Sequence, residues 1–273
     1  MSEVKSSKKI KGIRQFFVPT LVVVAIALAF FSGTLWQKVK NLESGSKVEN
    51  TTAQAPNAAP AAASLEDIKG IFDKDVIKIG DANRKVLFVE MADPSCPYCH
   101  IAGGFNPELS ASADTQANRF KYVSDGGKYV PPVPEMKKLV SEGKASYAYI
   151  YYPGHGSGEM GMKALYCAAE KGLFWEAHDL LLTNTGYTLL NTTVKNDKTQ
   201  SQAIANFLKS AVDPVFMKSC LDSGKYDARL ASDQELATSL GIQGTPNFYV
   251  NATNFAGAYS YTDLEPTVNS ALQ

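Results

Sequence analysis

Cysteine is scarce in this chain, with four residues in 273, at positions 96, 99, 167 and 220. Only one pair has C-x-x-C spacing. Neither a second such pair nor a closely spaced Cys/His pair accompanies it, which argues against a four-ligand zinc site. Basic residues form no stripe outside the first 15 positions, so nothing indicates nucleic-acid binding. No internal repeat is present, which excludes a repeat architecture.

Charged residues are absent from Phe16 to Trp36, an apolar stretch of 21 residues. As a helix it would span about 31 Å, the thickness of the hydrocarbon core of a membrane. Residues 1–15 contain five basic residues and one acidic residue, a net charge of +4. This predicts a cytoplasmic N-terminus and an exported remainder. No cysteine lies directly after the stretch, so a lipoprotein is not expected. We predict an uncleaved anchor at 16–36, with a cleaved signal peptide as the alternative.

Residues 37–64 form a predicted linker, because the segment 54–64 is rich in Ala and Pro and poor in bulky apolar side chains. The linker would hold a domain at residues 65–273 away from the membrane. Disulfides persist in the oxidising compartments that exported domains occupy. Cys167 and Cys220 remain once the C-x-x-C pair is set aside, and we expect them to form a structural disulfide. Two buried free thiols are the alternative.

The motif Cys96-Pro97-Tyr98-Cys99 follows the mostly apolar segment 86–91 after four intervening residues. Two cysteines three residues apart at a helix start face the same side, close enough to open and close a disulfide. The N–H groups of a helix start favour negative charge, which lowers the pKa of Cys96 and makes it an attacking thiolate. We therefore predict a thiol–disulfide exchange site, with Cys96 as nucleophile and Cys99 as resolving thiol. Pro97 and Tyr98 would tune the stability of the thiolate.

Other interpretations of the same residues remain open. Cys96, Cys99 and His100 fit the C-x-x-C-H pattern of c-type haem attachment, with His100 as an axial ligand. A purely structural disulfide is also possible, although so short a loop gains little from closure. In an exchange site, His100 either supports the Cys96 thiolate or faces solvent.

The hydrophobic pattern predicts an α/β domain. We expect a strand, a helix and a strand to form a right-handed βαβ unit, and a hairpin and a helix to end the chain. Residues 105–134 read as irregular, and Gly172 as a helix break. Predicted strands cover 76–80, 86–93, 144–152, 247–251 and 255–259. Predicted helices start near Cys96 and cover 135–142, 160–182, 201–208, 214–223, 226–240 and 262–272.

Over residues 65–273 the sequence resembles the DsbA-like branch of the thioredoxin superfamily. The strand leading into the C-P-Y-C motif, Gly172–Leu181 and Ser239–Asn251 carry the resemblance. It implies a thioredoxin-like fold, βαβ plus ββα around a mixed sheet, with a helical insertion at about 156–240 and no cofactor or metal. It also implies a cis bond between Thr245 and Pro246, beside the thiol pair. Residues 101–143 are longer and richer in Gly and Pro than the family pattern needs.

Two further residues are candidates for supporting roles. Glu90 lies in the buried strand six residues before Cys96 and matches the buried acid of the thioredoxin family. We expect it to shuttle the proton of Cys99, with a lysine ion pair as the alternative. His155 follows the strand 144–152 at the sheet edge from which the thiol motif leaves. It would lie near the active site, or be a turn residue without a role.

The resemblance implies a membrane-anchored oxidoreductase that forms disulfide bonds in exported proteins. Its substrates would be unfolded or folding chains, and a quinone-linked membrane partner would re-oxidise it. The alternatives are a reductase or isomerase on the same fold and a non-catalytic, chaperone-like binding protein. The sequence does not fix the direction of electron flow.

Overall fold

The computed structural model describes residues 63–113 and 118–273. The predicted basic tail, the predicted anchor at 16–36 and nearly all of the predicted linker lie outside the described residues. Within the described ranges, no helix combines the length and the apolar character that crossing a membrane requires.

One mixed sheet of five strands has the order β1-β3-β2-β4-β5. Strands β2 and β3 are parallel, and every other neighbouring pair is antiparallel. A parallel pair needs a crossover connection, so the chain between β2 and β3 forms helices that cover the sheet. The strands are β1 (Ile77–Ile79), β2 (Val86–Ala92), β3 (Ala145–Tyr151), β4 (Asn247–Val250) and β5 (Thr253–Ala256).

The helices lie on both faces of the sheet and beside it. In chain order they are α2 (Leu65–Ile71), α3 (Pro97–Gly103), α4 (Pro107–Ser112), the 3₁₀ turn η1 (Val123–Asp125), α5 (Pro132–Ser141), α6 (Glu159–Ala169), α7 (Phe174–Leu181), α8 (Asn184–Thr188), the π-helical turn η2 (Leu189–Val194), the 3₁₀ turn η3 (Lys198–Gln200), α9 (Ser201–Phe207), α10 (Pro214–Asp222), α11 (Asp227–Ser239) and α12 (Tyr261–Leu272).

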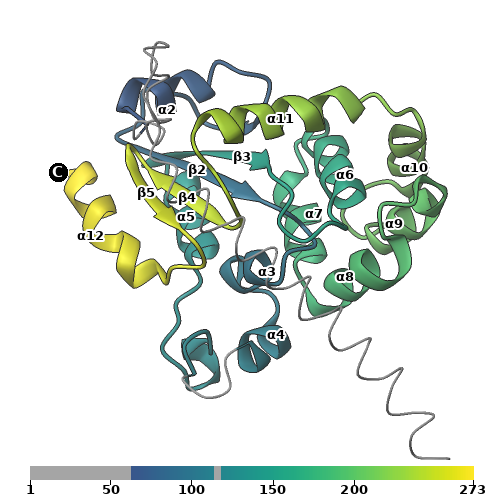
Figure 1. Ribbon diagram of the computed structural model, residues 1–273, viewed down its shortest axis with the longest axis horizontal. Coiled ribbons are helices and arrows are strands. Elements are labelled where there is room, and N and C mark those ends of the chain that lie inside the picture. Colours follow the sequence, from purple (N-terminus) through teal and green to yellow (C-terminus); the bar gives the residue numbers. More distant parts are fainter. Residues whose placement is uncertain (1–62, 114–117) are drawn as a thin grey trace, which may run out of the picture. The chain divides into compact units, whose positions relative to one another are not determined.

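The central strand β2 explains the layering, because all seven of its residues are buried. Its side chains alternate between the two faces. Leu87, Val89 and Met91 pack with α2 and the end of α11. Phe88 and Ala92 pack with α3, α5 and α12 on the other face. Figure 1 shows α2 and α11 above the sheet and α3 below it.

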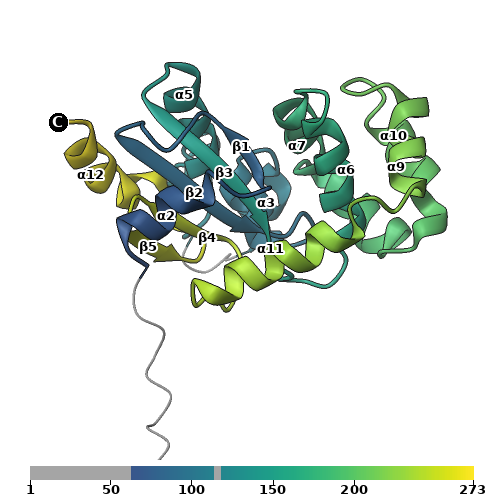
Figure 2. The same cartoon turned by 90° about the horizontal axis from the view of Figure 1, so that it is seen from above.

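The predicted helical insertion corresponds to α6 to α11. Figure 2 shows α6, α7, α9 and α10 gathered beside the sheet, and α11 returning across the sheet toward β4. The disulfide and many apolar side chains of these helices belong to the same core as the sheet.

Two expectations about secondary structure were wrong in part. Residues 105–134 are not irregular throughout, because α4, η1 and the start of α5 lie within them. The last strand begins at Thr253 rather than at residue 255. Asn251 has a φ of 51°, so the chain turns directly after β4, and β5 pairs with β4 from Thr253 onward. Residues Leu65–Ile71 form a helix that was not expected.

Candidate active site

The thiol pair lies where β2 leaves the sheet. Asp93 to Ser95 form a turn in which the Cys96 N–H donates to the Asp93 carbonyl at 2.9 Å. Cys96 is the N-cap residue of α3, and Pro97 occupies the first helical position, where a missing N–H costs nothing. Cys96 and Cys99 are free thiols, 3% and 1% exposed.

The two thiols have opposite electrostatic environments. The hydrogen bond from the Cys99 thiol is the main cause that lowers the pKa of Cys96 to about 7, and the backbone N–H groups of Tyr98 and Cys99 add to it. Burial raises the pKa of Cys99 well above its usual range, and the bond with Cys96 raises it further. At neutral pH the pair can therefore hold one thiolate, on Cys96, and one thiol, on Cys99.

A cis peptide bond joins Thr245 to Pro246, as expected from the sequence. This loop precedes β4 and reaches the thiol pair, because the Cys96 thiol donates to the Thr245 carbonyl at 3.5 Å. The Pro246 carbonyl accepts a bond from the Gly257 N–H at 2.9 Å, which ties the loop to the end of β5. Segments 149 residues apart in the chain thus meet at Cys96.

Glu90 is fully buried in β2, on the face that carries the thiol pair. The Tyr147 hydroxyl donates to its Oε2, and its Oε1 has no hydrogen-bond partner among the described residues. Burial raises the pKa of Glu90 to about 7, and the bond from Tyr147 opposes this rise. The alternative of a lysine ion pair was wrong for the part of the chain described, where the partner is a tyrosine.

Asp93 is a site residue that sequence reasoning missed. It is fully buried, and one carboxylate oxygen accepts from the N–H and the hydroxyl of Ser95, both at 2.7 Å. The other oxygen accepts from the N–H groups of Gly154 and His155, both at 2.8 Å. Gly158 allows this approach, since a Cβ there would lie 1.7 Å from Asp93 Oδ1. Asp93 therefore joins the turn before Cys96 to the loop after β3.

The expectations for His100 were wrong. The side chain is fully buried, with its ring nitrogens 2.9 Å from the Leu182 carbonyl and 2.8 Å from the Pro94 carbonyl. It neither faces solvent nor presents a free nitrogen to an axial position on a haem. Burial lowers the pKa of His100 to about 4, so at neutral pH it carries no charge that could support the Cys96 thiolate.

His155 lies in the loop that Asp93 holds. Its backbone N–H donates to Asp93, while its side chain is exposed. The neighbouring Gly154 is close to the cis-proline loop, because a Cβ at Gly154 would lie 1.8 Å from Thr245 Oγ1. The loop of His155 thus contacts both Asp93 and the cis-proline loop. No contact of the His155 imidazole with the thiols is present among the described residues.

Tyr98 has a partner in the chain between α3 and α5. Its ring is 43% exposed and lies 5.4 Å from the ring of Phe120, centroid to centroid. Phe120 packs with Tyr122 and Tyr129 against Ile101 of α3. The Tyr122 hydroxyl donates to the Ile101 carbonyl at 3.0 Å. This aromatic cluster supports the exposed edge of the active-site helix.

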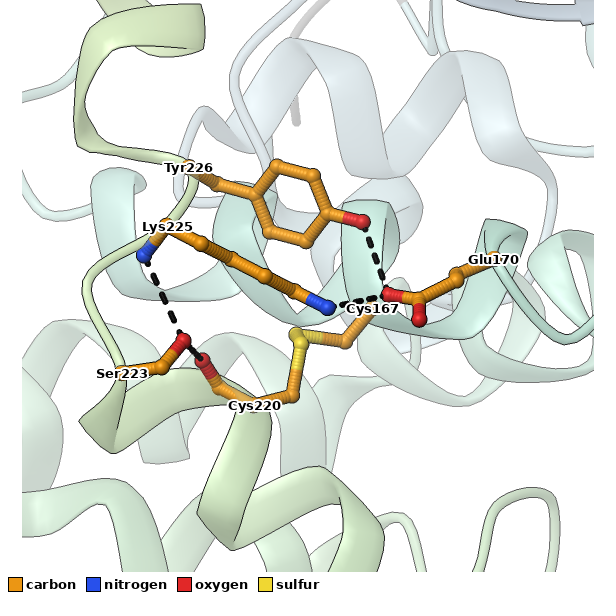
Figure 3. The surroundings of a disulfide bond; sticks show 6 residues. All are labelled: Cys167, Glu170, Cys220, Ser223, Lys225 and Tyr226. Atoms are coloured by element: carbon orange, nitrogen blue, oxygen red, sulfur yellow. Dashed lines mark hydrogen bonds and ion pairs between the residues drawn. A yellow bond between two sulfur atoms is a disulfide. The ribbon is translucent and has the colours of Figure 1, made fainter.

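The structural disulfide expected from the sequence is present between Cys167 of α6 and Cys220 of α10. Figure 3 shows a polar cover over this bond, in which the Glu170 carboxylate accepts from Lys225 and from the Tyr226 hydroxyl. Ser223 donates to the Cys220 carbonyl at 2.6 Å. Among residues 63–113 and 118–273, no three His, Cys, Asp or Glu side chains gather as a metal site requires.

Comparison with known proteins identifies a family for the part of the chain that follows the thiol pair. A family model described as thioredoxin matches residues 134–270, half of the chain, from α5 to α12. Oxidised BdbD from Bacillus subtilis superposes with a TM-score of 0.51 at 17% identity, over 80% of this chain and 99% of its own. The alpha-DsbA1 of Wolbachia pipientis gives 0.53 at 18% identity, over 72% and 91%.

Two curated relatives are much longer than this chain. The Na(+)/H(+) antiporter NhaA 3 of Salinispora tropica is 27% identical over 203 residues, which are 73% of this chain and 25% of that protein. NhaA 1 of Salinispora arenicola is 25% identical over 230 residues, 80% of this chain and 29% of that protein. The chain spans about a quarter of the length of these relatives. From its own fold and the match over half its length, the chain belongs to the thioredoxin family and has the fold of the DsbA-like thiol–disulfide oxidoreductases.

Proposed function

We propose that this protein is an extracytoplasmic thiol–disulfide oxidoreductase that introduces disulfide bonds into exported proteins through Cys96 and Cys99. The observation that carries the proposal is the opposite shift of the two thiol pKa values beside the cis-proline loop. A thiolate that is stable near neutral pH is a good leaving group, and it stabilises the reduced enzyme. These properties suit thiol–disulfide exchange in general, and a pKa of about 7 is also found in reductases of this fold. The direction of disulfide donation is proposed from the resemblance of the sequence to the DsbA-like proteins.

The reaction follows from the placement of the thiols. In the oxidised enzyme, a substrate thiolate attacks the Cys96 sulfur, the Cys96–Cys99 bond breaks, and Cys99 leaves with the electron pair. The protonated carboxyl of Glu90 gives its proton to the Cys99 thiolate. A second substrate thiolate then attacks the substrate sulfur of the mixed disulfide. The substrate disulfide forms, and Cys96 leaves as the thiolate.

The remaining site residues have positioning roles in this proposal. The Thr245 carbonyl and Pro246 line the approach to Cys96, and the exposed Tyr98 would contact the bound polypeptide. Pro97 starts α3 and so fixes the position of Cys96. His155 would act through the backbone of its loop.

The reduction potential of the Cys96–Cys99 pair tests the direction of electron flow. It is measured by equilibration with glutathione and mass mapping of alkylated thiols. We expect a value near about −120 mV, that of a strong disulfide donor. A value near about −270 mV would instead identify a reductase. Cys96→Ser should abolish exchange, whereas a chaperone-like binding protein would retain its activity in that variant.

We also propose that residues 16–36 anchor the protein in the membrane with the domain outside, and that a quinone-linked membrane protein re-oxidises it. The length and charge pattern of the sequence support the anchor. In cells, alkaline extraction should leave the chain in the membrane fraction. Depletion of quinone should trap Cys96 and Cys99 as thiols. A chain that is extracted into the soluble fraction would contradict the membrane anchor. A Cys96–Cys99 pair that stays oxidised after quinone depletion would contradict the quinone-linked partner.

A further inference from the structure

Strand β3 turns three tyrosines toward the active-site face of the sheet. Tyr147, Tyr149 and Tyr151 alternate along the strand, and all three pack in the core cluster that contains Cys96 and Cys99. Each is at most 1% exposed. The cluster therefore contains phenol hydroxyl groups close to a buried acid.

Only one of these hydroxyls binds Glu90 among the described residues. Glu90 is opposite Tyr149 in the register of the parallel pair, yet its Oε2 accepts from Tyr147. The Tyr149 hydroxyl is buried without a hydrogen-bond partner, and so is Glu90 Oε1. Two chemically identical side chains on one strand thus differ in whether their hydroxyl binds Glu90.

The ring of Tyr147 is held by aromatic packing. Its centroid lies 4.9 Å from that of Trp175 and 6.3 Å from that of Phe174, both from α7. The position of the hydroxyl is therefore set by the helix that covers β3, and not by the carboxylate alone.

No cation offsets the charge of Glu90 in the described part of the chain. His178 of α7 is neutral, because burial lowers its pKa. Lys137 of α5 binds Asp179 at 2.6 Å. Glu90 acts on the titration of Cys99, Tyr129, Tyr147 and Tyr149. The other charged groups that act on these side chains are all acidic: Cys96, Asp93, Asp179 and Asp263.

We propose that Tyr147 is a positioning residue that sets the pH at which Glu90 exchanges its proton with Cys99, as a neutral donor in place of an ionic partner. This inference rests on the proposed exchange reaction. When Glu90 gives its proton to the departing Cys99 thiolate, the new carboxylate keeps the hydrogen bond from Tyr147. The bond is stronger to the carboxylate than to the protonated carboxyl, so it moves the equilibrium toward proton release.

The test is Tyr147→Phe in the full-length protein, with Tyr149→Phe as the matched control. The titration of Glu90 is followed through its carboxyl stretching band in infrared difference spectra, and Glu90→Gln identifies the band. Loss of a bond to a charged group should raise the midpoint by about one to two pH units in Tyr147→Phe. Tyr149→Phe removes a hydroxyl without a partner and should leave the midpoint in place. The pH profile of Cys99 release from the enzyme disulfide should shift with the carboxyl.

An unmoved midpoint in Tyr147→Phe, or an equal shift in Tyr149→Phe, would overturn the inference. If Tyr147→Phe does not fold, 3-fluorotyrosine at position 147 replaces it. This phenol is a stronger donor and should lower the midpoint, and no change would again refute the role of Tyr147. The carboxyl is read without substrate. Absence of oxidase activity would therefore count against the proposed function. It would not affect the test of Tyr147, which depends only on the titration midpoint of Glu90.

Discussion

Removal of the Cys167–Cys220 disulfide gives a prediction whose size follows from the structure. The bond joins α6 to α10 across a sequence separation of 53 residues. For a loop of this length, the chain-entropy relation gives about 4 kcal/mol of stabilisation, through restriction of the unfolded chain. Both cysteines are buried, at 0% and 6% exposure. We expect the double variant Cys167→Ala/Cys220→Ala to lose about 3–4 kcal/mol of unfolding free energy.

Urea denaturation followed by far-UV circular dichroism measures this loss. Ser223→Ala is the matched control, because Ser223 binds the Cys220 carbonyl beside the disulfide but leaves the bond intact. It should cost about 1 kcal/mol. The double variant should keep the reduction potential of Cys96 and Cys99, since these thiols belong to α3 and the disulfide joins α6 to α10.

A loss below about 1 kcal/mol in the double variant would refute the reasoning. It would mean that packing already restricts α6 and α10 in the unfolded ensemble, so that the cross-link removes little entropy. A loss with an altered slope against urea would point to a changed denatured state.

Three further predictions concern the active site and its support. The rate at which iodoacetamide alkylates the reduced protein should rise with pH, with a midpoint near pH 7, the pKa of Cys96. A midpoint near pH 9 would contradict the stabilised thiolate. The raised pKa of Glu90 means that its contribution to stability is present below about pH 4.5 and lost as pH rises through about 7. The unfolding free energy of wild type minus that of Glu90→Gln should therefore fall by about 3 kcal/mol from pH 4 to pH 8 in urea titrations, and a flat difference would count against the shift. Phe120→Ala should cost about 2–4 kcal/mol and speed proteolytic cleavage between α3 and α5; unchanged cleavage would show that the aromatic cluster does not hold this segment.

Local sequence patterns were enough to predict the parts of the site that short motifs encode. The mostly apolar segment before Cys96 predicted a buried strand at 86–93, and β2 (Val86–Ala92) is fully buried. The Gly-Thr-Pro segment resembled the cis-proline loop of the family, and the bond before Pro246 is cis. In both cases the residues that decide the structure are neighbours in the chain.

Contacts between distant segments were beyond this reasoning. Asp93 is satisfied by backbone N–H groups about 60 residues later, which no side-chain pattern reveals. His100 looked like a surface or site histidine because its partners are the carbonyls of Pro94 and Leu182. The donor to Glu90 is a tyrosine on the neighbouring strand. The sequence had indicated a functional carboxylate there but not its partner.

The chain between α3 and α5 leaves and re-enters the domain at almost the same point. Helix α3 ends at Gly103, and the next residue, Gly104, caps it with a φ of 83°, which suits a glycine. A Cβ on Gly104 would lie 2.9 Å from Pro131, at the start of α5. Because the two ends touch, the segment can be lengthened, shortened or exchanged without separating β2 from β3. The close approach of Gly104 and Pro131 thus makes the segment a closed loop beside the active-site helix, with both of its ends fixed at one place in the fold.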